Sequence, residues 1–243
     1  MIAQLNDRIL LKLSGSDTQS FLQGQLSNDI DALEEGVVQP NAYCQHQGKI
    51  IALLWVMKQG DDFYLSFPDD LKAIVVQKLT MFKMMSAVEI IDVSDEIIQL
   101  GVIDGSFEGA FRLNKQQSVA LVESVDGVEL GNESEWESAC IANNIAEVTL
   151  ATSEKFVPQL LNLDINEVGV SFTKGCYPGQ EVVARLHYLG KSKRRMRQFE
   201  CEGEVDVGDE LVVVGSKSAK ASGIVVRRVK LGAKSSFLAT VEV

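Results

Sequence analysis

The stretch 172-FTKGCYPGQEVVAR-185 places a cysteine on a tightly constrained turn. Gly175 and Gly179 flank Cys176, and glycine adopts backbone angles that other residues avoid. Pro178 fixes its own φ and disfavours a helical conformation at Tyr177. After the turn, apolar residues recur at near-helical spacing, so we expect the loop to lead directly into the N-terminus of a helix.

The position of Cys176 before this helix bears on its chemistry. Backbone N–H groups and the helix dipole favour negative charge at a helix N-terminus, and Lys174 adds a positive charge nearby. We therefore expect the thiol to lose its proton more easily than a free cysteine. The same loop suits the binding of an anion such as a carboxylate or phosphate. An inert thiol that fills a tight turn is equally consistent with the local sequence.

The overall composition is that of an acidic globular protein. The chain has 243 residues, 46% of them hydrophobic, and a formal net charge of −11. Such a charge repels nucleic acid and anionic membranes unless a local patch reverses the sign. The N-terminus lacks a signal-peptide pattern, and the longest apolar run, 50-IIALLWVM-57, is too short to span a bilayer. We expect a cytoplasmic location and no membrane association.

The distribution of cysteine and histidine argues against a permanent metal. The four cysteines are widely spread without a C-x-x-C pair, which disfavours a disulfide framework or a thiolate zinc site. His46 and His187 are the only histidines. We expect most of the thiols to be small buried side chains and no stable metal site.

The pattern of apolar residues predicts an α+β fold. Helical spacing predicts helices over 17–26, 69–85 and 133–144. Strand patterns occupy 8–15, 37–68 and 88–125, with breaks expected at Gln47-Gly48, Gly60-Asp61, Gly101, Gly105 and Gly109. From Arg195 onward, short β runs separated by turns predict a small antiparallel barrel or sandwich.

The cysteine loop also carries a family resemblance. Lys-Gly-Cys-Tyr-x-Gly-Gln-Glu at 174–181, followed by Val-Ala-Arg at 183–185, resembles the signature of the YgfZ family. The stretches 15-GSDTQSFLQGQLSNDI-30, 41-NAYCQHQGKII-51 and 156-FVPQLLNLD-164 are similar to other motifs of that family. The resemblance implies a folate-binding protein related to the glycine cleavage T-protein, an aminomethyltransferase. It also implies a link to iron–sulfur cluster assembly or repair and to tRNA modification.

The resemblance implies a ring of ferredoxin-like subdomains around a folate pocket, followed by a C-terminal antiparallel β-barrel. We place the first α+β subdomain at 1–95 and the second at 96–192, ending in the cysteine loop and its helix. The barrel is expected at 193–243.

The resemblance also implies the site residues. Cys176 and Lys174 are the expected working groups, with tetrahydrofolate or a one-carbon derivative as the cofactor. The expected cofactor contacts are Trp136, Arg8, Gln25, Asn28, Asp29, Tyr177, Gln180, Glu181 and Arg185.

Several of these contacts have an ordinary structural alternative. Trp136, in 136-WESACI-141, offers a flat face to a pterin or benzoyl ring but can equally pack its helix on the core. Arg8 can stack on an aromatic ring, pair with a glutamate tail, or lie in solvent. Asn28 and Asp29 can serve as helix caps or turn residues. The family continues after the tryptophan with Gly-x-Pro, where this chain has 144-NIA-146, so the rim of that pocket is expected to differ.

One departure bears on activity. T-protein relatives use an aspartate after the glycine hairpin for aminomethyl transfer, and an ungapped comparison puts Ala52 or Leu53 there. Neither side chain can exchange a proton. Classical aminomethyltransferase chemistry is therefore not expected, while folate binding can survive.

The interval between Glu181 and Glu200 contains no acidic residue. It forms a basic strip within an acidic chain, made of Arg185, His187, Lys191, Lys193, Arg194, Arg195 and Arg197. The strip can meet a folate glutamate tail or, through 185–197, the backbone of tRNA. A solvated linker is the alternative.

Four functions are compatible with these features of the sequence. The favoured one is a folate-dependent accessory protein that serves iron–sulfur client proteins or assembly factors, with Cys176 beside the folate pocket. The others are a one-carbon (aminomethyl) transferase, a tRNA-binding factor without its own chemistry, and a fold that has lost its ligand.

Overall fold

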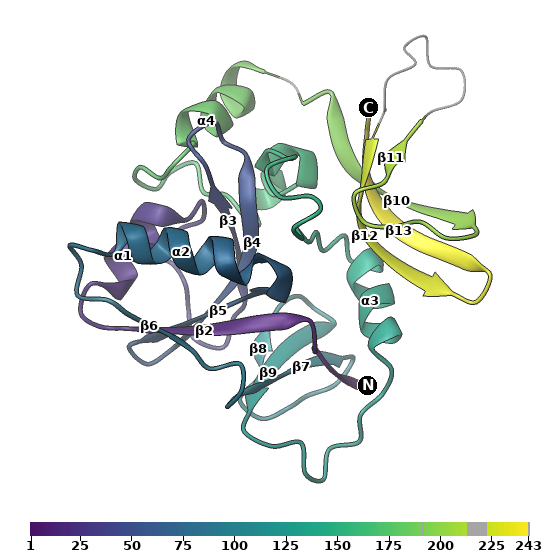
Figure 1. Cartoon of the computed structure of the whole chain (residues 1–243), viewed down its shortest axis with the longest axis horizontal. Helices are drawn as coiled ribbons and strands as arrows, with labels where there is room; N and C mark the ends of the chain where they lie inside the picture. Colours follow the sequence, from purple (N-terminus) through teal and green to yellow (C-terminus); the bar gives the residue numbers. More distant parts are fainter. Residues whose placement is uncertain (191, 213–222, 243) are drawn as a thin grey trace.

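A computed structural model describes residues 1–190, 192–212 and 223–242 (Figure 1). In these residues the strands form three separate antiparallel sheets, with helices packed around the first two. The α+β class predicted from the sequence is confirmed. The ferredoxin-like character of the subdomains, their closure into a ring and the closed C-terminal barrel stay predictions.

The first sheet is built around β4 (Ile50–Gln59), whose residues are buried from Ile50 to Met57. The strand order is β3-β4-β5-β2-β6, where the other strands are β2 (Arg8–Ser14), β3 (Gln39–Cys44), β5 (Asp62–Pro68) and β6 (Glu89–Asp92). Gly48 and Gly60 have positive φ at the two hairpin turns, as predicted. In such turns glycine adopts the left-handed conformation at no steric cost.

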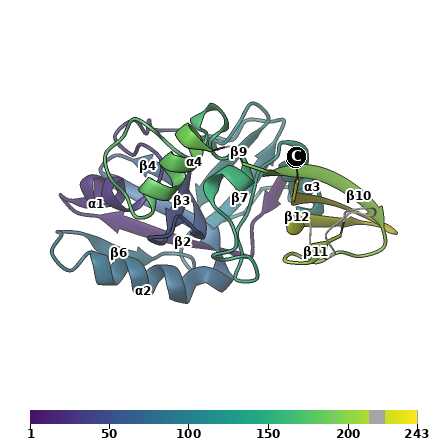
Figure 2. The same ribbon diagram turned by 90° about the horizontal axis from the view of Figure 1, so that it is seen from above.

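Two helices accompany this sheet. They are α1 (Thr18–Gln25) and α2 (Lys72–Phe82), the latter preceded by the 3-10 turn η1 (Asp69–Leu71). Both lie where helical spacing predicts them, with slightly shorter ends. Figure 2 shows α2 along one side of the sheet and α4 (Gln180–Leu189) on the other.

The second sheet has the order β1-β7-β9-β8, where the strands are β1 (Ile2–Gln4), β7 (Ile98–Ile103), β8 (Phe111–Arg112) and β9 (Gln117–Val122). Helix α3 (Glu133–Ala142) packs against it. The turn predicted at Gly101 is wrong, because this glycine lies inside β7. A Cβ at Gly101 would lie 2.5 Å from the indole of Trp136, so the glycine makes room for helix packing.

The third sheet, at the C-terminus, has the order β10-β13-β12-β11, where the strands are β10 (Arg194–Glu202), β11 (Glu210–Leu211), β12 (Gly223–Leu231) and β13 (Lys234–Glu242). It lies to one side of the molecule, with α3 beside it (Figure 1). The chain between the second and third sheets contains η2 (Pro158–Leu161), η3 (Ile165–Glu167) and α4. No helix in the described ranges is long and apolar enough to cross a membrane.

The buried side chains of β4 join two apolar clusters. Leu54 and Val56 belong to the larger cluster, whereas Trp55 and Met57 belong to a second cluster with Trp136. The two indoles meet edge to face, with ring centroids 6.3 Å apart and planes at 76°. Alternating side chains of one strand point to opposite faces of the sheet, so β4 holds both cores together.

Candidate functional site

The candidate binding site is a cavity of about 680 Å³, which we call the asparagine-rimmed cavity. Its lining comes from β3 and β4 of the first sheet, β10 of the third sheet, the turn between β8 and β9, the residues that follow α3, and the segment around η2 and η3. Five asparagines contribute polar groups: Asn114, Asn143, Asn144, Asn162 and Asn166. The apolar wall includes Leu53, Trp55, Ile145, Leu161, Leu163 and Met196. Small-molecule sites commonly combine this range of volume with apolar walls and a few polar groups.

The asparagines are held by backbone conformation and by hydrogen bonds. Asn144, Asn162 and Asn166 adopt left-handed φ values of 55°, 61° and 54°, which asparagine tolerates better than most residues. The Nδ2 of Asn162 donates to the carbonyl oxygen of Met196 at 2.9 Å. Its Oδ1 is buried and has no hydrogen-bond partner among the described residues. A buried acceptor without a partner is unfavourable, so a ligand donor that reached this oxygen would gain a hydrogen bond.

Of the two residues proposed for the aspartate position, only one lines the cavity. Leu53 lines the asparagine-rimmed cavity, whereas Ala52 is fully buried in the larger core cluster. No carboxylate is present among the described residues that line this cavity. The cavity wall itself therefore offers no acid or base for proton transfer.

The two tryptophans have different surroundings. Trp136 is buried against Gly101 and Trp55 and borders a second cavity. Trp55 lines the asparagine-rimmed cavity, although the sequence analysis did not single it out. The sequence contains a signal for Trp55, because it lies two residues after Leu53 in a predicted strand. Its side chain is therefore expected on the same face of the sheet as that of Leu53. The aromatic side chain at the candidate site is therefore Trp55.

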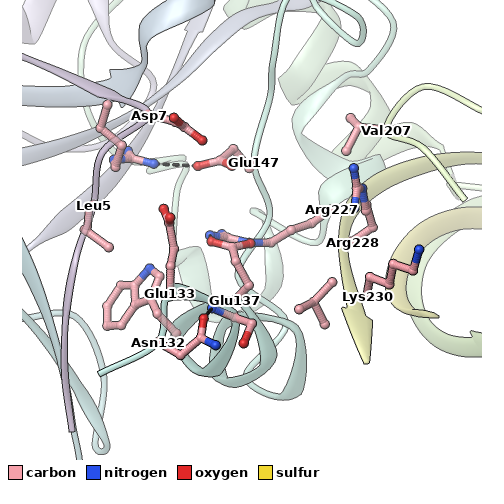
Figure 3. Close-up of a pocket in the computed structure, with 14 residues that line it drawn as sticks. Leu5, Asp7, Asn132, Glu133, Glu137, Glu147, Val207, Arg227, Arg228 and Lys230 are labelled. Atoms are coloured by element: carbon pink, nitrogen blue, oxygen red, sulfur yellow. Dashed lines mark hydrogen bonds and ion pairs between the residues drawn. The ribbon is translucent and has the colours of Figure 1, made fainter. Parts of the chain in front are cut away.

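The second cavity, of about 430 Å³, is lined mainly by charged residues, and we call it the charged cavity (Figure 3). Arg8 Nη1 lies 2.5 Å from Glu147 Oε1, and the Arg8 guanidinium carbon lies 3.9 Å from the centroid of the Trp55 ring. Arg8 Nε also donates to the Ser66 hydroxyl at 2.8 Å. The stacking and pairing roles considered for Arg8 are thus both filled by this chain's own side chains.

An arginine from the third sheet completes this arrangement. Figure 3 shows Arg227 reaching from β12 toward α3, where its Nε and Nη2 bind the Glu137 carboxylate at 2.8 and 2.7 Å. Burial alone would raise the pKa of Glu147, but Arg227 and Arg8 together hold it below its usual value. The four groups alternate in sign and connect the first sheet, α3 and the third sheet.

The ammonium group of Lys174, in the cysteine loop, is fully hydrogen-bonded to backbone carbonyls. Its side chain is buried, and its Nζ donates to the carbonyl oxygens of Gln23, Leu26 and Asn28, each at 2.7 Å. Burial lowers the pKa of Lys174 to about 8. All three N–H bonds of the ammonium are used on carbonyls at the end of α1. Lys174 therefore clamps the loop to α1 and has no donor left for a neighbouring thiolate.

The other anchors of the loop are Gly179 and Tyr177. Gly179 has φ 83°, and a Cβ there would lie 2.5 Å from the Gln45 carbonyl oxygen of the β3–β4 turn. The expectation that Gly175 also needs an unusual conformation is wrong, because its φ is not positive and open space surrounds it. The Tyr177 ring is buried, and burial raises the pKa of its hydroxyl.

Cys176 is exposed on this anchored loop. Cys44 and Cys140 are buried, so two of the four thiols, rather than most of them, are buried side chains. Burial raises the pKa of these two thiols to about 12 and about 11 respectively. Cys201 is partly exposed. Cys176 lines neither the asparagine-rimmed cavity nor the charged cavity. Its thiol is presented to the outside of the molecule.

The remaining predicted contacts lie around the loop or behind the cavity wall. Asn28 is buried, and its Nδ2 donates to the carbonyl oxygens of Pro40 and Val168, two residues of that wall. Asp29 Oδ1 accepts a hydrogen bond from Gln23 Nε2 at 2.8 Å.

Gln25 Oε1 is buried without a partner in the described part of the chain. Gln180 is the first residue of α4, and Glu181 and Arg185 are exposed on that helix. None of the predicted contacts named in this and the preceding paragraph lines the asparagine-rimmed cavity.

The basic strip is only partly free. Arg195 binds Asp164 at 2.5 and 3.0 Å, and Arg194 lies 3.7 Å from Glu242. Lys193 and Arg197 are exposed. Lys191 lies outside the described residues. Within the described ranges, no group of three or more His, Cys, Asp or Glu side chains is placed to hold a metal ion.

The comparisons with known proteins agree with the cysteine-loop motif. No family model matches the chain. An uncharacterized protein of Haemophilus influenzae is 31% identical over 233 residues, covering 91% of this chain and 82% of the relative. The "tRNA-modifying protein YgfZ" of Colwellia psychrerythraea is 26% identical, covering 80% of this chain and 70% of the relative. The same-named protein of Aliivibrio fischeri is 28% identical with nearly the same coverage.

A solved structure gives the fold. The glycine cleavage system aminomethyltransferase T of Bartonella henselae superposes with a TM-score of 0.68, covering 99% of this chain and 78% of the other. The two sequences are 11% identical, so this likeness concerns the fold alone. The chain belongs to the YgfZ family and has the fold of the glycine cleavage T-protein.

Proposed function

We propose that this protein is a cytoplasmic folate-binding accessory protein that supports iron–sulfur cluster assembly or repair and thereby tRNA modification. The observation that carries the proposal is the asparagine-rimmed cavity, whose described lining is neutral except for Arg197 and includes the residue with the unpartnered acceptor Asn162 Oδ1. The family resemblance supplies the folate, and the names of the relatives supply the link to tRNA modification. We also propose that the three sheets surround this cavity as a ring.

The residues present fit a reduced folate. Ile145, Ile165 and Val168 offer partly or well exposed apolar surface to a flat ring, and Asn162 Oδ1 is the acceptor for a ring N–H or amino group. A bound reduced folate supplies a carrier for one-carbon groups. The chain's own part is to orient the ring and to keep water from it, since the wall carries no acid or base.

The cavity wall disfavours the alternative of an aminomethyl transferase. A transferase of this type needs a carboxylate to handle a proton near the transferred group, and Leu53 is the cavity residue at the candidate position. We therefore propose binding without classical aminomethyl transfer.

We propose that Cys176 acts on a partner protein. Its thiol is exposed, its loop is fixed to α1 through Lys174, and it lines neither cavity. An exposed thiol on a fixed loop can attack, ligate a cluster briefly or form a mixed disulfide with an iron–sulfur client.

The names of the relatives favour a second candidate, direct tRNA binding through 185–197. Arg185, Lys193 and Arg197 are exposed and available to phosphates. This reading predicts an RNA affinity that falls steeply with salt, because phosphate contacts release counterions. Affinity for tRNA that does not change between low and moderate salt would exclude it.

Calorimetric titration with tetrahydrofolate under reducing conditions tests the main proposal. We expect micromolar binding, about −8 kcal/mol. Asn162→Gly keeps the left-handed backbone and removes the acceptor, so affinity should fall about tenfold, the equivalent of one net hydrogen bond of about 1.4 kcal/mol. Glu154→Gly is the matched control, because Glu154 has φ 61°, is exposed and lines neither cavity.

Two outcomes decide the test. Loss of affinity in Asn162→Gly but not in Glu154→Gly assigns the ligand to the asparagine-rimmed cavity. Absence of heat with the wild-type protein at millimolar ligand overturns folate binding. Trp136→Ala is a poor probe, because its ring is buried against Gly101 and Trp55 and its loss would disturb the fold.

A further inference from the structure

The charge on the lining of the asparagine-rimmed cavity is concentrated in one side chain. Every described residue of the lining is neutral except Arg197 on β10. The apolar wall and the asparagines therefore suit an uncharged body, and the only charge recognition available is for an anion. The ligand is then expected to combine a neutral ring system with one negatively charged end.

Arg197 differs from its neighbours on β10 in having no internal partner. Arg195 is held by Asp164 and by the Gln159 carbonyl, and Arg194 lies 3.7 Å from Glu242. No hydrogen bond or ion pair of the Arg197 side chain is found in the described ranges, and the residue is exposed. A free guanidinium beside a neutral cavity can bind a carboxylate with two parallel hydrogen bonds.

We propose that Arg197 is a specificity-determining residue that binds the carboxylate tail of the cavity ligand and sets its direction. The ring system lies against the apolar wall of the cavity, and the tail leaves the cavity past β10. This inference rests on the proposed folate binding and adds to it the ligand's charged end and the residue that selects it. Ligands that share the ring but lack the glutamyl carboxylates should bind more weakly.

The test compares two ligands and two variants by calorimetry. Tetrahydrofolate carries the two carboxylates of the glutamyl tail, whereas the primary benzamide of tetrahydropteroate has the same rings and no carboxylate. In the wild type we expect tetrahydrofolate to bind about five- to tenfold more tightly, a charge-assisted contact of about 1–1.4 kcal/mol. Arg197→Gln should abolish that difference by weakening tetrahydrofolate alone. The preference should also shrink with added salt, because the contact is exposed.

Lys193→Gln is the matched control. It removes one positive charge from the same exposed strip, and Lys193 does not line the cavity. The preference for the tail should therefore persist in this variant.

Each remaining outcome counts against the inference. Equal affinity of the two ligands for the wild type, or an unchanged preference in Arg197→Gln, overturns the role of Arg197 while leaving folate binding intact. A preference lost equally in Lys193→Gln shows a general charge effect and also overturns it. If neither ligand binds the wild type, the proposed function falls, and this inference falls with it.

Discussion

Lys174 gives the sharpest prediction about the cysteine loop. Its ammonium donates to the carbonyls of Gln23, Leu26 and Asn28, each at 2.7 Å. Removing the ammonium leaves three carbonyl oxygens without this donor, at about 1 kcal/mol each. Burial lowers the pKa of Lys174 from 10.5 to about 8, so the surroundings do not favour the charge by themselves. Lys174→Met keeps the apolar stem and loses the donors, so we expect it to lower the free energy of unfolding by about 3 kcal/mol.

Urea titration followed by circular dichroism measures this loss. Amide hydrogen exchange should localise it, with faster exchange in the cysteine loop and at the end of α1. Lys49→Met is the matched control, because the exposed Lys49 ammonium donates to one carbonyl, that of Lys155, at 3.2 Å. We expect its effect to stay within about 0.5 kcal/mol. If Lys174→Met is as stable as this control, the three hydrogen bonds of Lys174 do not stabilise the fold. A direct chemical role for Lys174 then becomes the better explanation.

Three further predictions concern packing and charge elsewhere. Arg227→Met removes a cation that is 3% exposed and should cost about 3–5 kcal/mol in urea titration. The exposed neighbour Arg228 should cost less than about 1 kcal/mol in the same substitution, and equal losses would refute the buried network. The lowered pKa of Glu147 makes a contribution that is full above its unfolded pKa of about 4.3 and is lost as the pH falls through the folded value. The melting temperature of the wild type should therefore fall more steeply with decreasing pH below that value than the melting temperature of Glu147→Gln. Parallel plots of melting temperature against pH would contradict this. Gly101→Ala puts a Cβ 2.5 Å from the Trp136 indole and should destabilise by about 1–3 kcal/mol, with a shift in tryptophan emission; an unchanged melting temperature would show that the indole moves freely.

The sequence predicts the local structure well where the residues that determine that structure lie within the same short segment. Helical spacing places α1, α2 and α3, and glycines with positive φ mark the turns at Gly48 and Gly60. Gly101 is misassigned because its cause lies in another element, the Trp136 indole of α3. A turn glycine and a packing glycine look the same in the sequence, and only the contact with a distant residue distinguishes them.

The candidate site is less accessible to sequence reasoning for the same reason. The motif includes Lys174, but the three carbonyl partners of its ammonium lie at the end of α1, about 150 residues earlier in the chain. The asparagine-rimmed cavity is lined by strands of the first and third sheets and by loops from other parts of the chain, and no single segment of it forms a motif. Trp55 looks like one more apolar residue in a buried strand until the cavity beside it is seen.

Asn28 connects the two halves of the candidate site. Its carbonyl accepts from Lys174 Nζ at 2.7 Å, while its Nδ2 donates to the Pro40 and Val168 carbonyls at 3.1 and 3.2 Å. Pro40 and Val168 both line the asparagine-rimmed cavity. The loop that presents Cys176 and the wall of the cavity are therefore held by one buried residue. Because a packed, hydrogen-bonded residue passes on displacements of its neighbours, we expect a displacement of the cysteine loop to change the cavity wall through Asn28. The segment around Asn28 and the cysteine loop are thus joined by hydrogen bonds into one structural unit.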